Sequence, residues 1–377
     1  MKRKTFRNTV KIKLFIKNLL YGFLCASLML TSYTFIVFDS PDVSVGNTFL
    51  NAVFTPPPKD INTFLETVFS IEKELTSEET AEPPTYIDYG KKLDEILSLY
   101  PQEKPELVIP EGCFGICAEN ISKQGNEKKI LFSDKSNKKL TAQYIESLTK
   151  KDYPIKASQS SDEPLVLILH THTTEAYLGE NDYYYNPKNA VAETRSHKNS
   201  ENVIAVGEVF ASVLESMGIN TLHCKDYHDI YVFNQSYNHS YDTVEKYLKA
   251  YPSIKYVIDL HRDSVIHTNG TKVQPVCEID QKRAAQVMLV IGTDGGGLTH
   301  KNWEKNLTLA TMLQEKLVES YGDLARPLNI RSGRFNQQLC PGMLLLEVGS
   351  CGNTLEQAKY AARLVALEYA ALIKDNL

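Results

Sequence analysis

The chain has 377 residues, of which 42% are hydrophobic and 23% are charged, and its formal net charge is −5. This length allows one catalytic-size domain with a sizeable core plus additional segments. Because the basic residues form no stripe and the balance is acidic, the composition argues against nucleic acid as a partner.

The first 38 residues predict a membrane anchor. Seven basic residues, from Lys2 to Lys17, come before any acidic residue, and the twenty residues from Leu19 to Phe38 carry no charge. A helix needs roughly 20 residues to cross the hydrocarbon core, and a basic flank predicts a cytoplasmic N-terminus. A cleaved signal peptide would have a shorter apolar core and a small-residue cleavage site, which does not follow Phe38. We therefore expect a cytoplasmic tail at 1–18 and a single-pass anchor at 19–38 in the cell membrane, with an extracytoplasmic remainder.

Residues 39–163 are predicted to be an extracytoplasmic spacer with short helices. Proline clusters at 56–58 and 83–84 interrupt this region, and helical patterns at 62–73 and 89–99 lie between and after them. Such a segment would hold a domain away from the membrane. Seven cysteines lack four-cysteine zinc spacing, and Cys113 with Cys117 is the first pair to test as a disulfide in an exported chain.

From Pro164 onward, apolar runs are followed by polar residues that suit catalysis. The run Leu165–Leu169 predicts a buried strand and leads directly into the segment His170–Glu175, with sequence HTHTTE. Apolar residues from Val203 to Met217 recur at helical spacing and stop at Gly218. Glu201 is therefore predicted to lie in the first turn of this helix.

Two later apolar runs are also followed directly by polar residues that suit catalysis. The run Tyr256–Leu260 leads into His261 and Arg262, and the run Met343–Leu346 leads into Glu347. An apolar strand that ends in a carboxylate needs a reason to tolerate the charge. A salt bridge would be the plain structural explanation for Glu347, just as the helix dipole would be for Glu201.

The remaining pattern alternates strands with helices. It predicts helices at 242–250, 303–321 and 354–373 and a strand at 287–291. This alternation predicts an α/β domain at 164–377 with a doubly wound, mostly parallel sheet and helices on both faces. The glycines at 295–297 lack phosphate-loop spacing and are interpreted as a flexible loop on the substrate side. The tyrosines at 183–185 are expected either to stack on sugar rings or to pack their own loop.

The strand ends of such a sheet converge on one crevice, which would bring the polar residues together. Two imidazoles and one carboxylate suit a catalytic zinc that keeps its fourth position open, and a second carboxylate would serve as base. A single histidine at a strand end is more often structural. The repeated arrangement of strand and ligand favours a metal-dependent hydrolase.

Four segments resemble the stage II sporulation protein P family: Leu169–Glu175, Asp259–Asp263, Ile291–Gly295 with Trp303 and Asn306, and Leu346–Gly349. The resemblance covers about Pro164 to the C-terminus and the membrane-anchored layout before it. This family contains peptidoglycan hydrolases that act in engulfment during endospore formation, and its catalytic domain is similar to zinc-dependent N-acetylmuramoyl-L-alanine amidases.

The resemblance implies a site. It places the zinc ligands at His172, Glu201 and His261 and the catalytic base at Glu347. The wider amidase pattern has Pro-Gly-His where this chain has His170-Thr-His172, so His170 remains either a supporting residue or an alternative ligand. Arg262 would steady an oxyanion or a substrate carboxylate, unless it forms a salt bridge with Asp263 or another carboxylate.

The implied reaction is hydrolysis of the amide between the N-acetylmuramoyl lactyl group and L-alanine, with D,D-endopeptidase cleavage of cross-links as a second activity. The implied partners are peptidoglycan, the membrane, and stage II sporulation proteins D and M. A catalytically idle wall-binding scaffold is the alternative of another class. A zinc amidohydrolase or carboxypeptidase for small acyl amino acids is the nearer alternative, although the anchor and spacer favour a large external substrate.

Overall fold

The computed structural model describes residues 108–122, 129–159, 162–180, 182–189, 194–230 and 235–377. The predicted cytoplasmic tail, the anchor at 19–38 and the helices at 62–73 and 89–99 lie outside the described residues. In the described ranges, no helix combines the length and apolar character needed to cross a bilayer.

The described part contains both strands and helices, so the prediction of a mixed α/β fold is confirmed. The strands are β1 (Phe114–Glu119), β2 (Phe132–Lys135), β3 (Val166–Leu169), β4 (Tyr184–Tyr185), β5 (Thr221–His223), β6 (Tyr256–Asp263), β7 (Lys272–Ile279), β8 (Lys282–Ala285), β9 (Val287–Gly292), β10 (Leu328–Arg331) and β11 (Gly342–Ser350). The α-helices are α5 (Ala142–Leu148), α7 (Val203–Ser216), α8 (Ser236–Ala250), α9 (Trp303–Tyr321) and α10 (Leu355–Lys374). Short 3₁₀ segments are η1 (Pro187–Asn189), η3 (Gly322–Leu324) and η4 (Gln337–Leu339).

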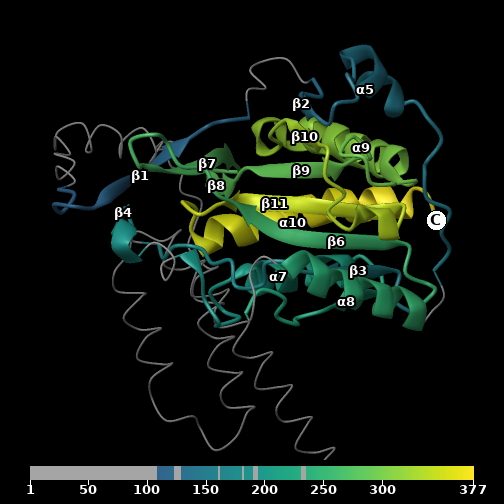
Figure 1. The fold of residues 1–377 in the computed structure, drawn as a ribbon, viewed down its shortest axis with the longest axis horizontal. Helices are drawn as coiled ribbons and strands as arrows, with labels where there is room; N and C mark the ends of the chain where they lie inside the picture. Colours follow the sequence, from purple (N-terminus) through teal and green to yellow (C-terminus); the bar gives the residue numbers. More distant parts are fainter. Residues whose placement is uncertain (1–107, 123–128, 160–161, 181, 190–193, 231–234) are drawn as a thin grey trace, which may run out of the picture. The chain divides into compact units, whose positions relative to one another are not determined.

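The strands form two sheets. A small sheet has the order β4-β1-β7-β8, and a large one has the order β2-β10-β9-β11-β6-β3-β5 (Figure 1). The unit of the chain that contains both sheets begins at Lys104. Since β1, β2 and α5 precede Pro164, the folded unit is longer than the range 164–377 assigned from the sequence.

The large sheet consists of two blocks that run in opposite directions. Strands β5, β3, β6 and β11 are mutually parallel, and β9, β10 and β2 are parallel to one another. The blocks meet at β11 and β9, which pair antiparallel with Glu347 opposite Met288. The expected parallel arrangement therefore holds within each block, but β9 and β10 end at the opposite edge of the sheet from β3, β6 and β11.

Helices cover both faces of the large sheet because successive strand side chains point to opposite faces. Ile168, Ile258 and Leu344 face the main core, which includes buried residues of α5, α7, α9 and α10. Leu169 and Val257 face the other side and pack with Val244 of α8. This alternation fixes which face each polar residue at a strand end will approach.

Several boundaries match the sequence pattern and others extend beyond it. Helix α9 has the predicted bounds, and α10 begins with a capping box in which the side chains of Thr354 and Gln357 bond reciprocally to backbone N–H groups. Helix α8 begins six residues before the predicted Asp242. Strand β6 continues through His261 to Asp263 because β11 pairs with it that far.

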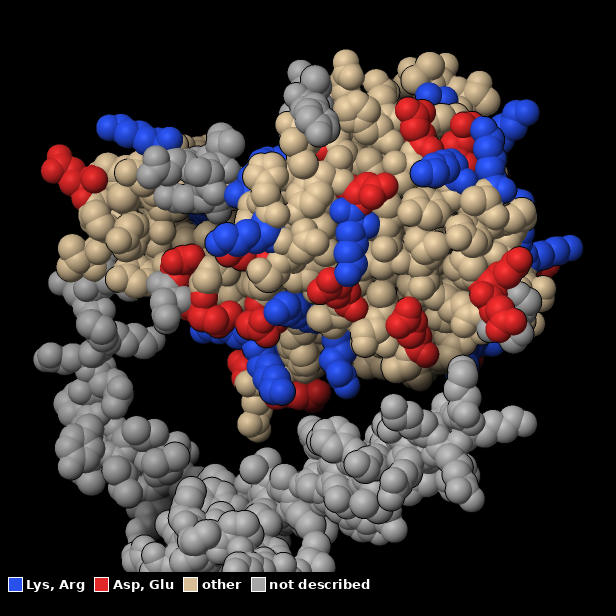
Figure 2. Space-filling model, turned by 90° about the horizontal axis from the view of Figure 1, so that it is seen from below, with Lys and Arg blue, Asp and Glu red and all other residues tan. Residues whose placement is uncertain are grey.

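On the face in Figure 2, lysine and arginine side chains are interspersed with aspartate and glutamate. Cys113 and Cys117 are both free thiols, so the disulfide considered for them is not formed.

Candidate functional site

The ends of β3, β6 and β11 lie side by side at one edge of the large sheet. Leu169 pairs with Asp259, and His261 pairs with Glu347. Beyond the end of β3, the ring of His172 meets the ring of His261 edge to face, with centroids 5.4 Å apart. The structure therefore brings together three of the predicted site residues, His172, His261 and Glu347.

His170 lies beneath this cluster, on the α7 side of the sheet. Its ring is fully buried, with Nδ1 2.8 Å from the carbonyl oxygen of Leu260 and Nε2 2.8 Å from Nε2 of His223. Burial, helped by the nearby His223, lowers the pKa of His170 to about 3, so the ring is neutral. Since Nδ1–H donates to the carbonyl, Nε2 accepts the N–H of His223, and both ring nitrogens of His170 are engaged.

Glu175 is a site residue that sequence reasoning did not single out. Its buried carboxylate oxygen Oε2 accepts the backbone N–H of Arg262 at 3.1 Å and lies 3.5 Å from Nδ1 of His261. Burial by itself raises the pKa of Glu175, but contact with His261 and the charge of Arg262 outweigh it and hold that pKa well below its ordinary value. Its position three residues after His172, in the same short segment, was the available signal.

Asp259 holds the other side of the His261 ring. Its Oδ1 lies 2.9 Å from Nε2 of His261, and its carboxylate also accepts the backbone N–H and the hydroxyl of Thr171. Burial lowers the pKa of His261, but Asp259 and Glu175 raise it well above its ordinary value. A carboxylate behind a histidine fixes the orientation of the ring, which is the usual arrangement around a metal-binding imidazole.

Glu347 projects from β11 on the same side of the sheet as His261. Its Oε2 is buried and has no hydrogen-bond partner among the described residues. Burial raises the pKa of Glu347, and the nearby carboxylate of Glu175 adds to the effect while His261 opposes it. A carboxyl group with a raised pKa beside a cluster of ionised groups is suited to accepting and returning a proton near neutral pH.

Glu201 lies in a different environment from the one predicted. Its side chain is 47% exposed and pairs with Lys198 at 2.9 Å and with the hydroxyl of Ser196 at 2.8 Å. The prediction that it lies in the first helical turn is wrong, because Asn202 caps α7 by accepting the N–H of Ile204. The Glu201 carboxylate thus contacts Lys198 and Ser196, which lie outside the cluster.

Arg262 lies on the opposite face of β6 from His261. Its guanidinium donates to the carbonyl oxygens of Ala176 at 2.9 Å and Thr194 at 2.6 Å. The carboxylate of Asp263 instead pairs with Arg326 at 2.8 Å, so the salt bridge considered for Arg262 and Asp263 goes to a different arginine. Arg262 thereby fixes the backbone segment that carries Glu175.

The donor types at this edge fit a zinc ion. Nitrogen and oxygen ligands of a tetrahedral zinc, each about 2.1 Å from the metal, lie roughly 3.4 Å apart. The 3.5 Å between Glu175 Oε2 and His261 Nδ1 matches that spacing and is longer than a usual hydrogen bond. In the described ranges, the one group of three potential ligands whose ligating atoms all lie within 4.8 Å of one another is elsewhere in the fold. The ligating atom of His172 therefore lies farther than this from that of Glu175 or His261.

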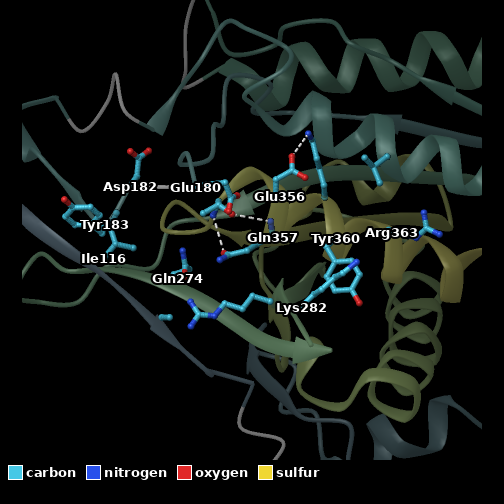
Figure 3. Close-up of a pocket in the computed structure, with 15 residues that line it drawn as sticks. Ile116, Glu180, Asp182, Tyr183, Gln274, Lys282, Glu356, Gln357, Tyr360 and Arg363 are labelled. Atoms are coloured by element: carbon cyan, nitrogen blue, oxygen red, sulfur yellow. Dashed lines mark hydrogen bonds and ion pairs between the residues drawn. The ribbon is translucent and has the colours of Figure 1, made fainter. Parts of the chain in front are cut away.

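A hollow of about 830 Å³ lies between the small sheet and α10 (Figure 3). Its lining includes Tyr183, Gln274 and Lys282, and none of the predicted catalytic or metal-binding residues lines it. Tyr183 and Tyr184 are exposed, whereas Tyr185 is buried and donates to the carbonyl oxygen of Gly270. Packing of the loop therefore accounts for Tyr185, and the first two tyrosines remain open to a ligand.

The glycine loop after β9 lies at the opposite edge of the sheet. A Cβ on Gly295 would overlap the carbonyl oxygen of Ser136, so this loop packs closely against the turn after β2. Asp294 pairs there with Lys138 at 2.5 Å. The interpretation of residues 295–297 as a substrate-side loop is wrong, because β9 runs antiparallel to β11.

Comparison with known proteins gives one family and a few relatives. Residues 115–368 match the family model for stage II sporulation protein P. The chain is 30% identical over 243 residues to "Stage II sporulation protein P" of Bacillus subtilis (strain 168), a match that covers 60% of this chain and 55% of that relative. The chain thus spans about half the length of the curated relative it matches.

Two solved structures show partial similarity. One is the CwlD amidase from Clostridioides difficile in complex with the GerS lipoprotein, with a TM-score of 0.32 and 14% identity, covering 55% of this chain and 96% of that one. The other is an N-acetylmuramoyl-L-alanine amidase from Clostridium difficile 630, with a TM-score of 0.31 and 13% identity, covering 57% and 97%.

Proposed function

The chain belongs to the stage II sporulation protein P family, and from this premise we propose that it is a zinc-dependent peptidoglycan hydrolase that acts in engulfment during endospore formation. The observation that carries the proposal is the cluster of His172, Glu175, His261 and Glu347 at three converging strand ends. Burying so many ionisable groups together costs folding free energy. Such clusters are therefore typical of sites that bind a ligand or carry out a reaction.

The proposed reaction is hydrolysis of the amide between the N-acetylmuramoyl lactyl group and L-alanine. His172, Glu175 and His261 would hold the zinc, and Asp259 would keep the His261 ring in place. When bound, zinc polarises a carbonyl and lowers the pKa of a bound water toward about 7. Glu201, the ligand predicted from the sequence, is the alternative to Glu175.

Glu347 would act as the general base and then as the general acid. Its carboxylate would take the proton of the attacking water and return it to the leaving amine of L-alanine. The raised pKa of Glu347 supports both steps, because a group that binds a proton near neutral pH both accepts and releases it. Arg262 and His170 would act indirectly, by holding the backbone beneath Glu175 and His261.

The further parts of the proposal rest on family membership and on the N-terminal sequence. They comprise a single-pass anchor at 19–38 with the catalytic domain outside the cell membrane, D,D-endopeptidase cleavage of cross-links at the same centre, and assembly with stage II sporulation proteins D and M. Both bond types are amides, so one centre would serve both activities.

The test is digestion of purified peptidoglycan by the full-length chain in detergent, with products identified by mass. Stem peptides with a free L-alanine amino terminus, lost on chelation and restored by zinc, are the expected result. Separated cross-links in the same sample would show the endopeptidase activity. An intact wall with zinc bound would indicate an enzyme that needs its partners, and an intact wall without bound zinc would favour a wall-binding scaffold.

A further inference from the structure

A second group of ligand-type side chains lies on the small sheet. The thiol of Cys117 donates to Oε1 of Glu119 at 2.7 Å, and Nε2 of His267 lies 2.6 Å from the same oxygen. The sulfur, the carboxylate oxygen and the imidazole nitrogen all lie within 4.8 Å of one another. Cys117 is half-buried, and the side chains of His267 and Glu119 are 47% and 36% exposed, so solvent ions can reach all three.

The fold brings His267 from a distant part of the sequence to Cys117 and Glu119. Cys117 and Glu119 are alternate residues of β1, so they face the same side of the strand. Ile116 and Ala118 point the other way, into the hollow of Figure 3. His267 lies in the turn between β6 and β7, where its N–H bonds to the carbonyl oxygen of Thr271, and β7 pairs with β1.

From this arrangement we infer that Cys117, Glu119 and His267 form a second zinc-binding site, distinct from the centre at the large sheet. Thiolate, imidazole and carboxylate are the three side-chain ligands that zinc takes. Around a tetrahedral zinc, sulfur and oxygen ligands lie about 3.6 Å apart and nitrogen and oxygen ligands about 3.4 Å apart. The present contacts to Glu119 are shorter because hydrogen bonds hold them, so zinc entry requires the Glu119 carboxylate to move back by about 1 Å.

Zinc binding at this site would release protons and would link two parts of the small sheet. Zinc binds cysteine as thiolate and histidine through an unprotonated ring nitrogen. The thiol proton that Cys117 donates to Glu119 would be released to solvent, and the proton that His267 Nε2 directs at the same carboxylate would move to Nδ1 or be released as well. Three protein ligands leave a fourth position for water or for a group from a partner. The ion would join β1, near the start of the unit that contains both sheets, to the turn before β7 and would stabilise the small sheet.

Cobalt substitution in the full-length, reduced chain in detergent tests this site apart from the catalytic centre. A thiolate bound to Co²⁺ gives a sulfur-to-metal charge-transfer absorption, and the proposed catalytic ligands include no sulfur. We expect this band in the wild type, its loss in Cys117→Ser, and its displacement by added Zn²⁺. Glu347→Gln and His172→Ala should keep the band, so failure of the proposed function would leave this result unaffected.

Cys113→Ser is the matched control, since it removes a neighbouring free thiol that is not part of the group. Zinc should also raise the Tm of the wild type more than that of Cys117→Ser or His267→Gln, and these two variants cover the case in which one fails to fold. A folded, reduced wild type that shows no charge-transfer band with excess cobalt would overturn the inference, as would a band lost in Cys113→Ser but kept in Cys117→Ser.

Discussion

At one edge of the large sheet, β3, β6 and β11 end together, and at the opposite edge β9 and β10 end together. The first edge buries His261 between the carboxylates of Glu175 and Asp259, beside the half-buried Glu347. The second edge is closed by a glycine loop packed on backbone, with a half-buried ion pair between Lys138 and Asp294.

The two edges should respond differently to substitution. Buried charges oppose stability and are retained where they bind or react, whereas close backbone packing mainly supports stability. Substitutions at the β3, β6 and β11 edge should therefore affect activity and metal binding, and substitutions at the β9 and β10 edge should affect stability.

The largest expected effect is at Glu347. Glu347→Gln should lower the rate of stem-peptide release by about 10²- to 10⁴-fold, the usual contribution of a general base. Zinc content and Tm should stay close to those of the wild type because the shape of the side chain is preserved. Mass analysis of released muropeptides measures the rate, with Asp294→Asn as the matched carboxylate control at the other edge. Substantial remaining activity in Glu347→Gln would remove Glu347 from the role of base.

The second comparison separates the two glutamates proposed as ligands. Glu175→Gln should weaken zinc binding by about 100-fold or more, since it removes a charged ligand beside His261. Glu201→Gln should leave zinc binding unchanged because its present partners are Lys198 and Ser196. Competition with a chromophoric chelator measures both affinities, in a Cys117→Ser background so that the catalytic centre alone is titrated. A larger loss of zinc affinity in Glu201→Gln than in Glu175→Gln would instead support Glu201 as the ligand, as the sequence predicts.

The two histidines of the first motif should differ in the same way. His172→Ala should release zinc and keep the fold. His170→Ala should retain zinc but lower the Tm, because it leaves His223 and the carbonyl oxygen of Leu260 without their partner inside the core. Zinc content and Tm, measured for both variants, show which histidine binds zinc and which supports the fold. Zinc loss in His170→Ala alone would show that His170 is the ligand.

The sequence predicts much of this edge because its signals are local. Strand β3, helix α9 and the position of Glu347 follow from apolar runs and helical spacing. The direction of β9 does not follow from the sequence, because the same apolar run fits a strand that runs either way. Only the antiparallel pairing of β9 with β11 determines its direction. Sequence reasoning misses the role of Glu175 for a similar reason: the bridge between Ala176 and Asn202 is a long-range contact that no spacing reveals.

At the opposite edge, Gly295→Ala should destabilise the fold by about 1–3 kcal/mol because its Cβ would meet the carbonyl oxygen of Ser136. The folded fraction should keep its hydrolytic rate. Gly333→Ala is a matched control, since its Cβ would meet the Phe335 ring only at an ordinary contact distance of 3.4 Å. Urea unfolding measures both. A loss of activity without a loss of stability in Gly295→Ala would mean that this edge takes part in the reaction.

The smallest expected effect concerns the pH dependence of stability at His300, which is buried beside Asp294 and Arg334 with no hydrogen bond to either ring nitrogen from the described residues. Burial lowers its folded-state pKa to about 4, below the value near 6.5 of an unfolded chain. The unfolded state therefore binds the proton first, and the stability that His300 contributes above pH 6.5 is lost as the pH falls toward 4. His300→Leu removes this titration, so the free energy of unfolding of the wild type should fall relative to the variant across that range. A difference between the two that is independent of pH would show that the His300 ring is hydrated, and that this edge is more open than its packing indicates.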